Sequence, residues 1–160
     1  MTANQLIFGF YGSNLVKDKF HMGTLLCTSS FGNMRFMATS GLKHYQGIGS
    51  CGVKGKGGIP PCELVGLQKY TVTTTPIPMP HVRGVEGNFY QILPFQVTVV
   101  QYGKKSYRSD LGIHADKNVL GSSGCIVIPP GEHWKEFEEL MGKIRKGGIK
   151  TLDLFVSKNY

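Results

Sequence analysis

The amino-acid sequence predicts one mainly β domain with a single α-helix in its C-terminal region. The chain has 160 residues, the length of one ordinary domain. Glycine accounts for 22 of them, about twice the ~7% share of an average protein, and eight prolines accompany it. With short runs of β-branched and aromatic residues, this composition is typical of strands joined by many turns. Only one stretch has the residue spacing of an amphipathic helix.

The expected strands are short and are separated by turn residues. A hairpin is predicted over residues 24–39. The glycine- and lysine-rich segment 40–61 is predicted to be a long loop, which in a compact domain is usually functional or mobile. After that loop, in chain order, the predicted strands are residues 63–75, 88–92, 95–101, 104–113, 126–128 and 150–157.

The one predicted helix begins at Glu132. Its apolar residues recur at spacings of three and four and so share one face: Trp134, Phe137, Leu140, Met141 and Ile144. Acidic residues come early and basic residues late, which complements the helix dipole, and Gly147 and Gly148 supply a stop. We expect the apolar face to be part of the core.

The charge of the chain limits the partners we expect. Lys and Arg number 18 and Asp and Glu number 10, so 18 − 10 gives +8. No motif of an RNA- or DNA-binding module accompanies this charge, so we predict a solvated basic face and no nucleic acid. General attraction to an anionic polymer is also consistent with it. No run approaches the ~20 apolar residues of a membrane span. The first residues lack the basic region of a secretory signal peptide, which predicts synthesis in the cytoplasm.

The four cysteines match no zinc-binding spacing; they are Cys27, Cys51, Cys62 and Cys125. Without a secretory signal, free thiols are expected, although a disulfide between Cys51 and Cys62 is geometrically conceivable.

The segment 112–128 contains the most informative pair of residues. His114 ends one apolar stretch, and Cys125 begins the next, eleven positions later (125 − 114). If the two stretches pair as strands, their backbones lie about 4.8 Å apart. The imidazole and the thiol would then stand side by side, which is the arrangement that a cysteine nucleophile requires.

Such a pair needs the imidazole because an ordinary thiol, with a pKa near 8.5, is only a few per cent thiolate at pH 7. His114 could take the proton and hold the thiolate as an ion pair, oriented by Asp116 or by a backbone carbonyl. The turn at Ser122, Ser123 and Gly124 has small side chains and N–H groups that could stabilise an oxyanion. Two other interpretations are a core cysteine with an unrelated surface histidine, and a zinc site of His114, Asp116 and Cys125.

His114 together with Ser123-Gly124-Cys125-Ile126 resembles the active-site signature of the L,D-transpeptidase catalytic domain (YkuD-type) family, in a compact His…Ser-x-Gly-Cys subgroup. The hairpin 24–39, followed by Thr39-Ser-Gly41, is similar to that family's opening hairpin. Residues 57–61 and 70–72 resemble its next element, and the resemblance covers roughly residues 24–156.

The resemblance implies an L,D-transpeptidase-like β-sandwich or barrel and a cysteine acyl-enzyme mechanism without metal or cofactor. It implies that Cys125 is the nucleophile and His114 the base, and that the turn at Ser123, Gly124 and Cys125 is the oxyanion site. The implied substrate is a peptidoglycan stem peptide cut at an L-to-D centre. The acyl group would pass to an amine (transpeptidase) or to water (carboxypeptidase).

The sequence departs from the family's pattern at two places. Ser123 stands where many members have a histidine, and Val127 and Ile128 fill the stretch where many have an arginine. The candidates for the missing positive charge are Arg108, or Lys54 and Lys56 in the long loop. Substrate binding is accordingly predicted for Arg108, Asp116 and Ser122.

The predicted absence of a signal peptide raises the question of how the protein would reach a cell wall. A wall enzyme without one suggests a phage virion component or an effector delivered to the cell wall or periplasm by a secretion machine. The alternative is a phage tail or capsid structural protein that keeps the fold without turnover. Residues 1–23 are then an N-terminal extension or assembly arm preceding a domain at 24–160, and the arm's aromatic residues are Phe8, Phe10, Tyr11 and Phe20.

Overall fold

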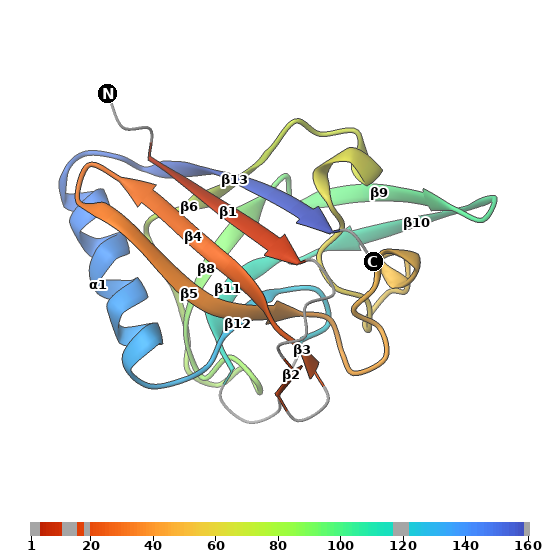
Figure 1. Ribbon diagram of the computed structural model, residues 1–160, viewed down its shortest axis with the longest axis horizontal. Coiled ribbons are helices and arrows are strands. Elements are labelled where there is room, and N and C mark those ends of the chain that lie inside the picture. Colours follow the sequence, from red (N-terminus) through yellow and green to blue (C-terminus); the bar gives the residue numbers. More distant parts are fainter. Residues whose placement is uncertain (1–3, 11–15, 18–19, 117–121, 159–160) are drawn as a thin grey trace.

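Figure 1 shows the computed structural model of the protein, which describes residues 4–10, 16–17, 20–116 and 122–158. The strands of the main sheet are β1 (Gln5–Phe10), β4 (Gly23–Ser29), β5 (Gly32–Ser40), β6 (Tyr70–Thr73), β7 (Ile77–Met79), β8 (Gly87–Leu93), β11 (Gly112–Ala115), β12 (Ile126–Ile128) and β13 (Thr151–Lys158). Two further ladders pair β2 (Val16–Lys17) with β3 (Phe20–His21), and β9 (Gln96–Gln101) with β10 (Lys104–Ser109). The helical elements are α1 (Glu132–Lys146) and two 3-10 turns, η1 (Ile48–Ser50) and η2 (Cys62–Val65).

The main sheet closes on itself. Its strand order is β11-β12-β5-β4-β1-β13-β6-β8-β7, and β11 also pairs with β8. Because the first strand of the order bonds to a strand at the other end, the sheet forms a barrel, and β7 pairs with the first part of β8. The prediction of a mainly β barrel or sandwich with one helix near the C-terminus is confirmed.

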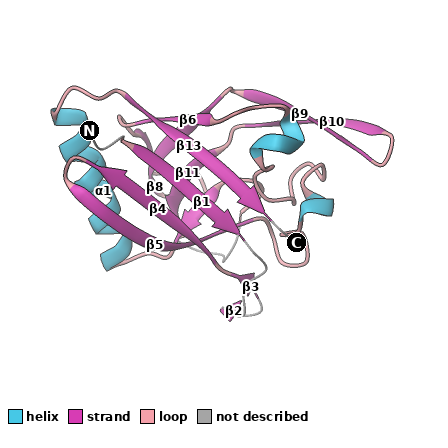
Figure 2. Cartoon of the chain, turned by 45° about the horizontal axis from the view of Figure 1, so that its top comes forward, coloured by secondary structure: helices cyan, strands magenta, loops and turns pink. Residues whose placement is uncertain are grey.

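Helix α1 covers one end of the barrel, and the β9–β10 hairpin projects from the opposite end (Figures 1 and 2). The apolar face predicted for the helix is buried as expected. Phe137 meets Phe36 of β5 and Tyr90 of β8 edge-on, with ring centroids 5.5 and 5.4 Å apart. Aromatic contacts of this geometry add to the hydrophobic gain from burial, so the helix closes the core.

Most of the predicted strands are present, and two differ in extent. The hairpin 24–39 is β4 and β5. The predicted strand 63–75 is wrong in its first half, because residues 62–65 form the turn η2, which ends at Gly66 with a φ of 70°. The predicted strand 104–113 divides into β10 and β11 at Asp110, whose φ of 58° turns the chain.

The N-terminal segment is not a separate arm, which corrects the predicted boundary at residue 23. β1 lies inside the sheet, parallel to β13 and antiparallel to β4. Leu6 and Phe8 are fully buried in the core. A strand whose alternate residues enter the core belongs to the domain, and the composition of residues 1–23 did not reveal its two neighbours. Tyr11 lies outside the described residues.

Replacing Phe8 by alanine is expected to destabilise the whole domain by about 3–5 kcal/mol, because it leaves a large cavity at a fully buried position. The measurement is urea unfolding of the intact chain. The control is Phe155→Ala on β13, where the side chain is 36% exposed and the expected loss is much smaller. If residues 1–23 were an assembly arm, Phe8→Ala would leave the unfolding midpoint unchanged.

The cysteines are all free thiols, as expected from the sequence: Cys27, Cys51 and Cys62 are buried, and Cys125 is partly exposed. In the described part of the chain, no helix is both long and apolar enough to cross a membrane.

Candidate functional site

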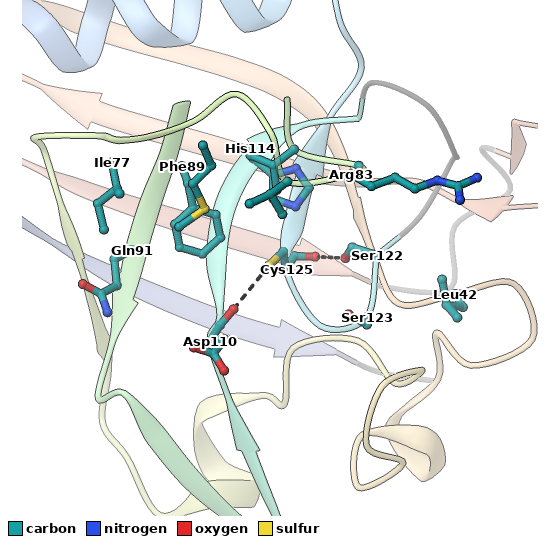
Figure 3. Close-up of a pocket in the computed structure, with 14 residues that line it drawn as sticks. Leu42, Ile77, Arg83, Phe89, Gln91, Asp110, His114, Ser122, Ser123 and Cys125 are labelled. Carbon is teal, nitrogen blue, oxygen red and sulfur yellow. Dashed lines mark hydrogen bonds between the residues drawn. The ribbon is translucent and has the colours of Figure 1, made fainter. Parts of the chain in front are cut away.

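His114 and Cys125 come from neighbouring strand ends, as their spacing predicted. β11 and β12 pair in parallel, with Ile113 beside Ile126, so Cys125 lies immediately before β12 and next to β11. Both side chains line one cavity of about 520 Å³, and Figure 3 shows His114 above Cys125 in that view. The other lining residues are Leu42, Ile77, Met79, Val82, Arg83, Gly84, Val85, Phe89, Gln91, Asp110, Ser122 and Ser123.

The ring of His114 is held by two contacts. Its Nδ1 lies 2.8 Å from the carbonyl oxygen of Ala115, and its face stacks on Phe89 with ring centroids 6.0 Å apart. Since a carbonyl only accepts, Nδ1 carries the proton in the neutral ring, and Nε2 keeps its lone pair. Of the two orienting groups expected for His114, the backbone carbonyl is therefore the one in contact. Asp116 is buried, and its N–H donates to Ile128.

Desolvation favours the neutral forms of both groups, even though the side chain of Cys125 is partly exposed on the cavity wall. Desolvation raises the pKa of the Cys125 thiol to about 12, although an N–H from Gly112 and the charge of Arg108 act in the opposite direction. Desolvation also lowers the pKa of His114 below its usual 6.5. The resting pair is thus a thiol beside a neutral base, and the expected preformed ion pair is not what this environment favours. The thiol donates to the carbonyl of Asp110, 3.6 Å away.

The carbonyl groups of Ser123 and Gly124, in the turn before β12, accept hydrogen bonds from side chains that lie outside the cavity lining. Ser123 O accepts from Arg108 Nη2 at 2.8 Å, and Gly124 O accepts from Ser40 Oγ at 3.2 Å. In a trans peptide the N–H points opposite to the C=O of the same unit. The N–H groups of Gly124 and Cys125 therefore point away from Arg108 and Ser40, and Ser122 Oγ fixes the next unit by donating to Cys125 O. These hydrogen bonds hold the two peptide units in fixed directions, and fixed N–H donors are one requirement of an oxyanion site.

Glycine is required at position 124. Its φ is +133°, a conformation that other residues rarely adopt. A Cβ there would lie 2.7 Å from Arg108 Nη2 and 2.8 Å from Leu111 Cδ2. The small residue before the cysteine thus lets the turn lie directly against the arginine.

Arg108 lies beneath the turn, which corrects the expectation that it binds substrate. It is 2% exposed and is absent from the cavity lining. Its guanidinium donates to four backbone carbonyls, those of Cys51, Gly57, Gly58 and Ser123. Arg108 therefore ties the long loop to the turn at residues 122–125, and all of its described hydrogen bonds are internal.

The remaining predicted residues divide between the cavity and its surroundings. Ser122 and Ser123 line the cavity, whereas Lys54, Lys56 and Asp116 do not. Lys56 Nζ instead lies 5.1 Å from the ring centroid of Tyr45.

Sequence reasoning missed most of the cavity wall, including Arg83, Phe89 and Gln91. Arg83 is an exposed cation on the cavity wall, and Phe89 and Gln91 form the wall beside His114 (Figure 3). Phe89 and Gln91 could have been found from the alternation of β8, because odd-numbered positions on that strand share a face. Arg83 lies in a turn, for which the sequence has no comparable signal.

Among the described residues, no three His, Cys, Asp or Glu side chains are grouped as metal ligands, so the zinc alternative at His114, Asp116 and Cys125 has no support.

Comparisons of the chain with models of known protein families, with curated proteins and with solved structures found no match.

Proposed function

We propose that the protein is a cysteine-dependent acyltransferase or peptidase of the L,D-transpeptidase type, acting on peptidoglycan stem peptides through an acyl-enzyme on Cys125. The observation that supports this most is the pairing of β11 with β12, which brings Cys125 to the same cavity as a histidine whose Nε2 has no hydrogen-bond partner among the described residues. The type of substrate comes from the resemblance of residues 114–126 to that family.

The proposed first step is a proton transfer coupled to attack. Nε2 of His114 takes the proton of the Cys125 thiol as the sulfur forms a bond to the substrate carbonyl carbon. The carbonyl oxygen becomes an oxyanion that accepts from the N–H groups of Gly124 and Cys125. Collapse breaks the C–N bond, and the leaving amine takes the proton from Nε2. A second amine or a water molecule then attacks the thioester carbon, and Nε2 of His114 removes its proton. Collapse of this second oxyanion breaks the C–S bond, and the Cys125 sulfur takes the proton back from Nε2.

The cavity suits a peptide that carries apolar and charged groups. Apolar side chains of β7, of β8 and of the turn between them form most of its wall, and the exposed Arg83 and Asp110 add a positive and a negative charge. An overall charge of +8 favours association with an anionic wall polymer. For delivery, we propose a phage virion or a secretion machine.

The test is incubation of the protein with purified tetrapeptide-bearing peptidoglycan, followed by mass analysis of the muropeptides. We expect exchanged, cross-linked or shortened stems with the natural sequence and none with Cys125→Ala. Cys27→Ala, which changes a buried core thiol, is the matched control and should retain product. No product from any of these proteins, with assembly into a larger particle, would instead support the virion structural protein.

A further inference from the structure

A second cavity adjoins the site that contains Cys125. It has a volume of about 490 Å³ and shares two lining residues, Ile77 and Gln91, with the first cavity. Figure 3 shows these two side chains on the side of the site away from Leu42 and Arg83. The remaining lining residues are Thr73, Thr75, Arg145, Gly148, Lys150 and Thr151. A ligand that extends past Gln91 therefore passes from one cavity into the other.

A row of residues across four strands and the catalytic turn connects the two cavities. Gly112 of β11 pairs with Gln91 of β8, and Thr73 of β6 pairs with Thr151 of β13. Continuing the register of Val72 with Ile92 by one residue places Thr73 opposite Gln91. The parallel pairing of β11 with β12 likewise places Gly112 beside Cys125. At about 4.8 Å per strand, the second cavity begins about 10 Å from Cys125 along the sheet and ends about 19 Å from it.

The second cavity is cationic. Arg145 and Lys150 are its ionisable lining residues, and three threonines contribute hydroxyl groups. Nη1 of Arg145 donates to Thr74 O at 2.6 Å, which fixes the guanidinium at the cavity wall. The nearby acid on the same helix, Glu138, accepts hydrogen bonds from Asn88 and Tyr90. Glu138 and Glu139 lie with Arg145 on the wall of a neighbouring cavity. The described lining of the second cavity itself has no acidic residue and sets Arg145 and Lys150 beside hydroxyl and amide groups, a setting that recognises a carboxylate.

We propose that the second cavity binds a carboxylate of the peptide substrate, placed three to six residues from the carbonyl that Cys125 attacks. An extended peptide rises about 3.3 Å per residue, so that length spans the 10–19 Å between Cys125 and the cavity. The inference rests on the proposed function and specifies its substrate as an extended peptide with an acidic group at this position, such as the second stem of a cross-linked pair.

The experiment uses cross-linked pairs of stem peptides as probes, in free-acid form and with their carboxylates amidated. The test variant is the double substitution Arg145→Gln with Lys150→Gln. Its control is Lys143→Gln with Lys146→Gln, which removes the same charge from exposed positions of α1 outside the cavity. Lys150→Gln alone is included because it leaves the contact of Arg145 with Thr74 intact. KM and kcat are measured for the natural sequence and for each variant with both probes. Binding of both probes is measured with the same substitutions combined with Cys125→Ala, which cannot turn them over.

The expected result is a rise of about tenfold in KM for the free-acid probe in the test variant, with kcat unchanged, and a rise of about threefold with Lys150→Gln alone. The control variant and the amidated probe should show neither change. Equal KM values for the test and control variants, with turnover retained, would overturn the carboxylate site and leave the proposed function standing. If the natural sequence turns over neither probe and Cys125→Ala binds neither, the carboxylate site is overturned. The proposed function falls as well only if tetrapeptide-bearing peptidoglycan also gives no product.

Discussion

Replacing His114 by alanine is expected to lower kcat/KM on stem peptides by about 10²–10⁴-fold, the usual contribution of a positioned general base. The effect is large because burial holds the Cys125 thiol protonated, so the sulfur depends on the imidazole to remove its proton during attack. The measurement is steady-state turnover of a tetrapeptide stem. The control is His133→Ala, which removes an exposed histidine at the start of α1.

The pH profile checks the same residue independently. His114 acts as a base only when it is neutral, and its pKa lies below 6.5 because the ring is buried. Activity should therefore be full at pH 7 and should fall with acid at a midpoint below pH 6.5. Retained turnover in His114→Ala, or an acid limb with its midpoint well above 6.5, would contradict the assignment of His114 as the base.

Replacing Arg108 by glutamine is expected to damage both stability and activity. The substitution removes donors from carbonyls of the long loop and of the turn, among them Gly57 and Ser123. Each buried carbonyl left without a partner costs about 1–3 kcal/mol, so we expect a loss of about 3 kcal/mol or more in the free energy of unfolding. The carbonyl of Ser123 and the N–H of Gly124 belong to the same peptide unit, which can rotate once Arg108 no longer holds it. Loss of this N–H as an oxyanion donor should lower kcat by about 10²–10³-fold in the folded protein.

These effects are measured by urea unfolding and by turnover under conditions where the variant is folded. Arg35→Gln, which changes an exposed arginine on β5, is the matched control. Arg108→Lys should recover part of the stability and little of kcat, because an ammonium cannot reach all four carbonyls as the planar guanidinium does. A folded Arg108→Gln protein with an unchanged kcat and a raised KM would show instead that Arg108 binds substrate.

The sequence predicted the parts of this molecule that depend on local pattern. The spacing of Trp134, Phe137 and Leu140 predicted α1 and its buried face, because helical periodicity is a property of neighbouring residues. The positions of His114 and Cys125 relative to two apolar runs predicted adjacent strand ends, and β11 and β12 pair accordingly. In both cases the decisive contacts lie within a short segment of the chain.

The parts that depend on distant contacts could not be predicted in the same way. Nothing in the segment around Phe8 indicates that β13, from the far end of the chain, pairs with β1. The burial of Arg108 depends on carbonyls about fifty residues earlier in the chain, which composition does not place. The protonation state of Cys125 likewise depends on burial by the assembled barrel, so the sequence suggested a thiolate where the structure favours a thiol.

Peptide mapping by mass spectrometry, on protein quenched during turnover, tests most directly the central claim that Cys125 is the nucleophile. The protein is mixed with a tetrapeptide stem, quenched in acid within the first turnovers, digested and mapped. We expect the acyl fragment of the stem, attached as a thioester, on the peptide that contains Cys125 and on no other cysteine peptide. Product formation with no such adduct, or with the adduct on another residue, would contradict a nucleophilic role for Cys125.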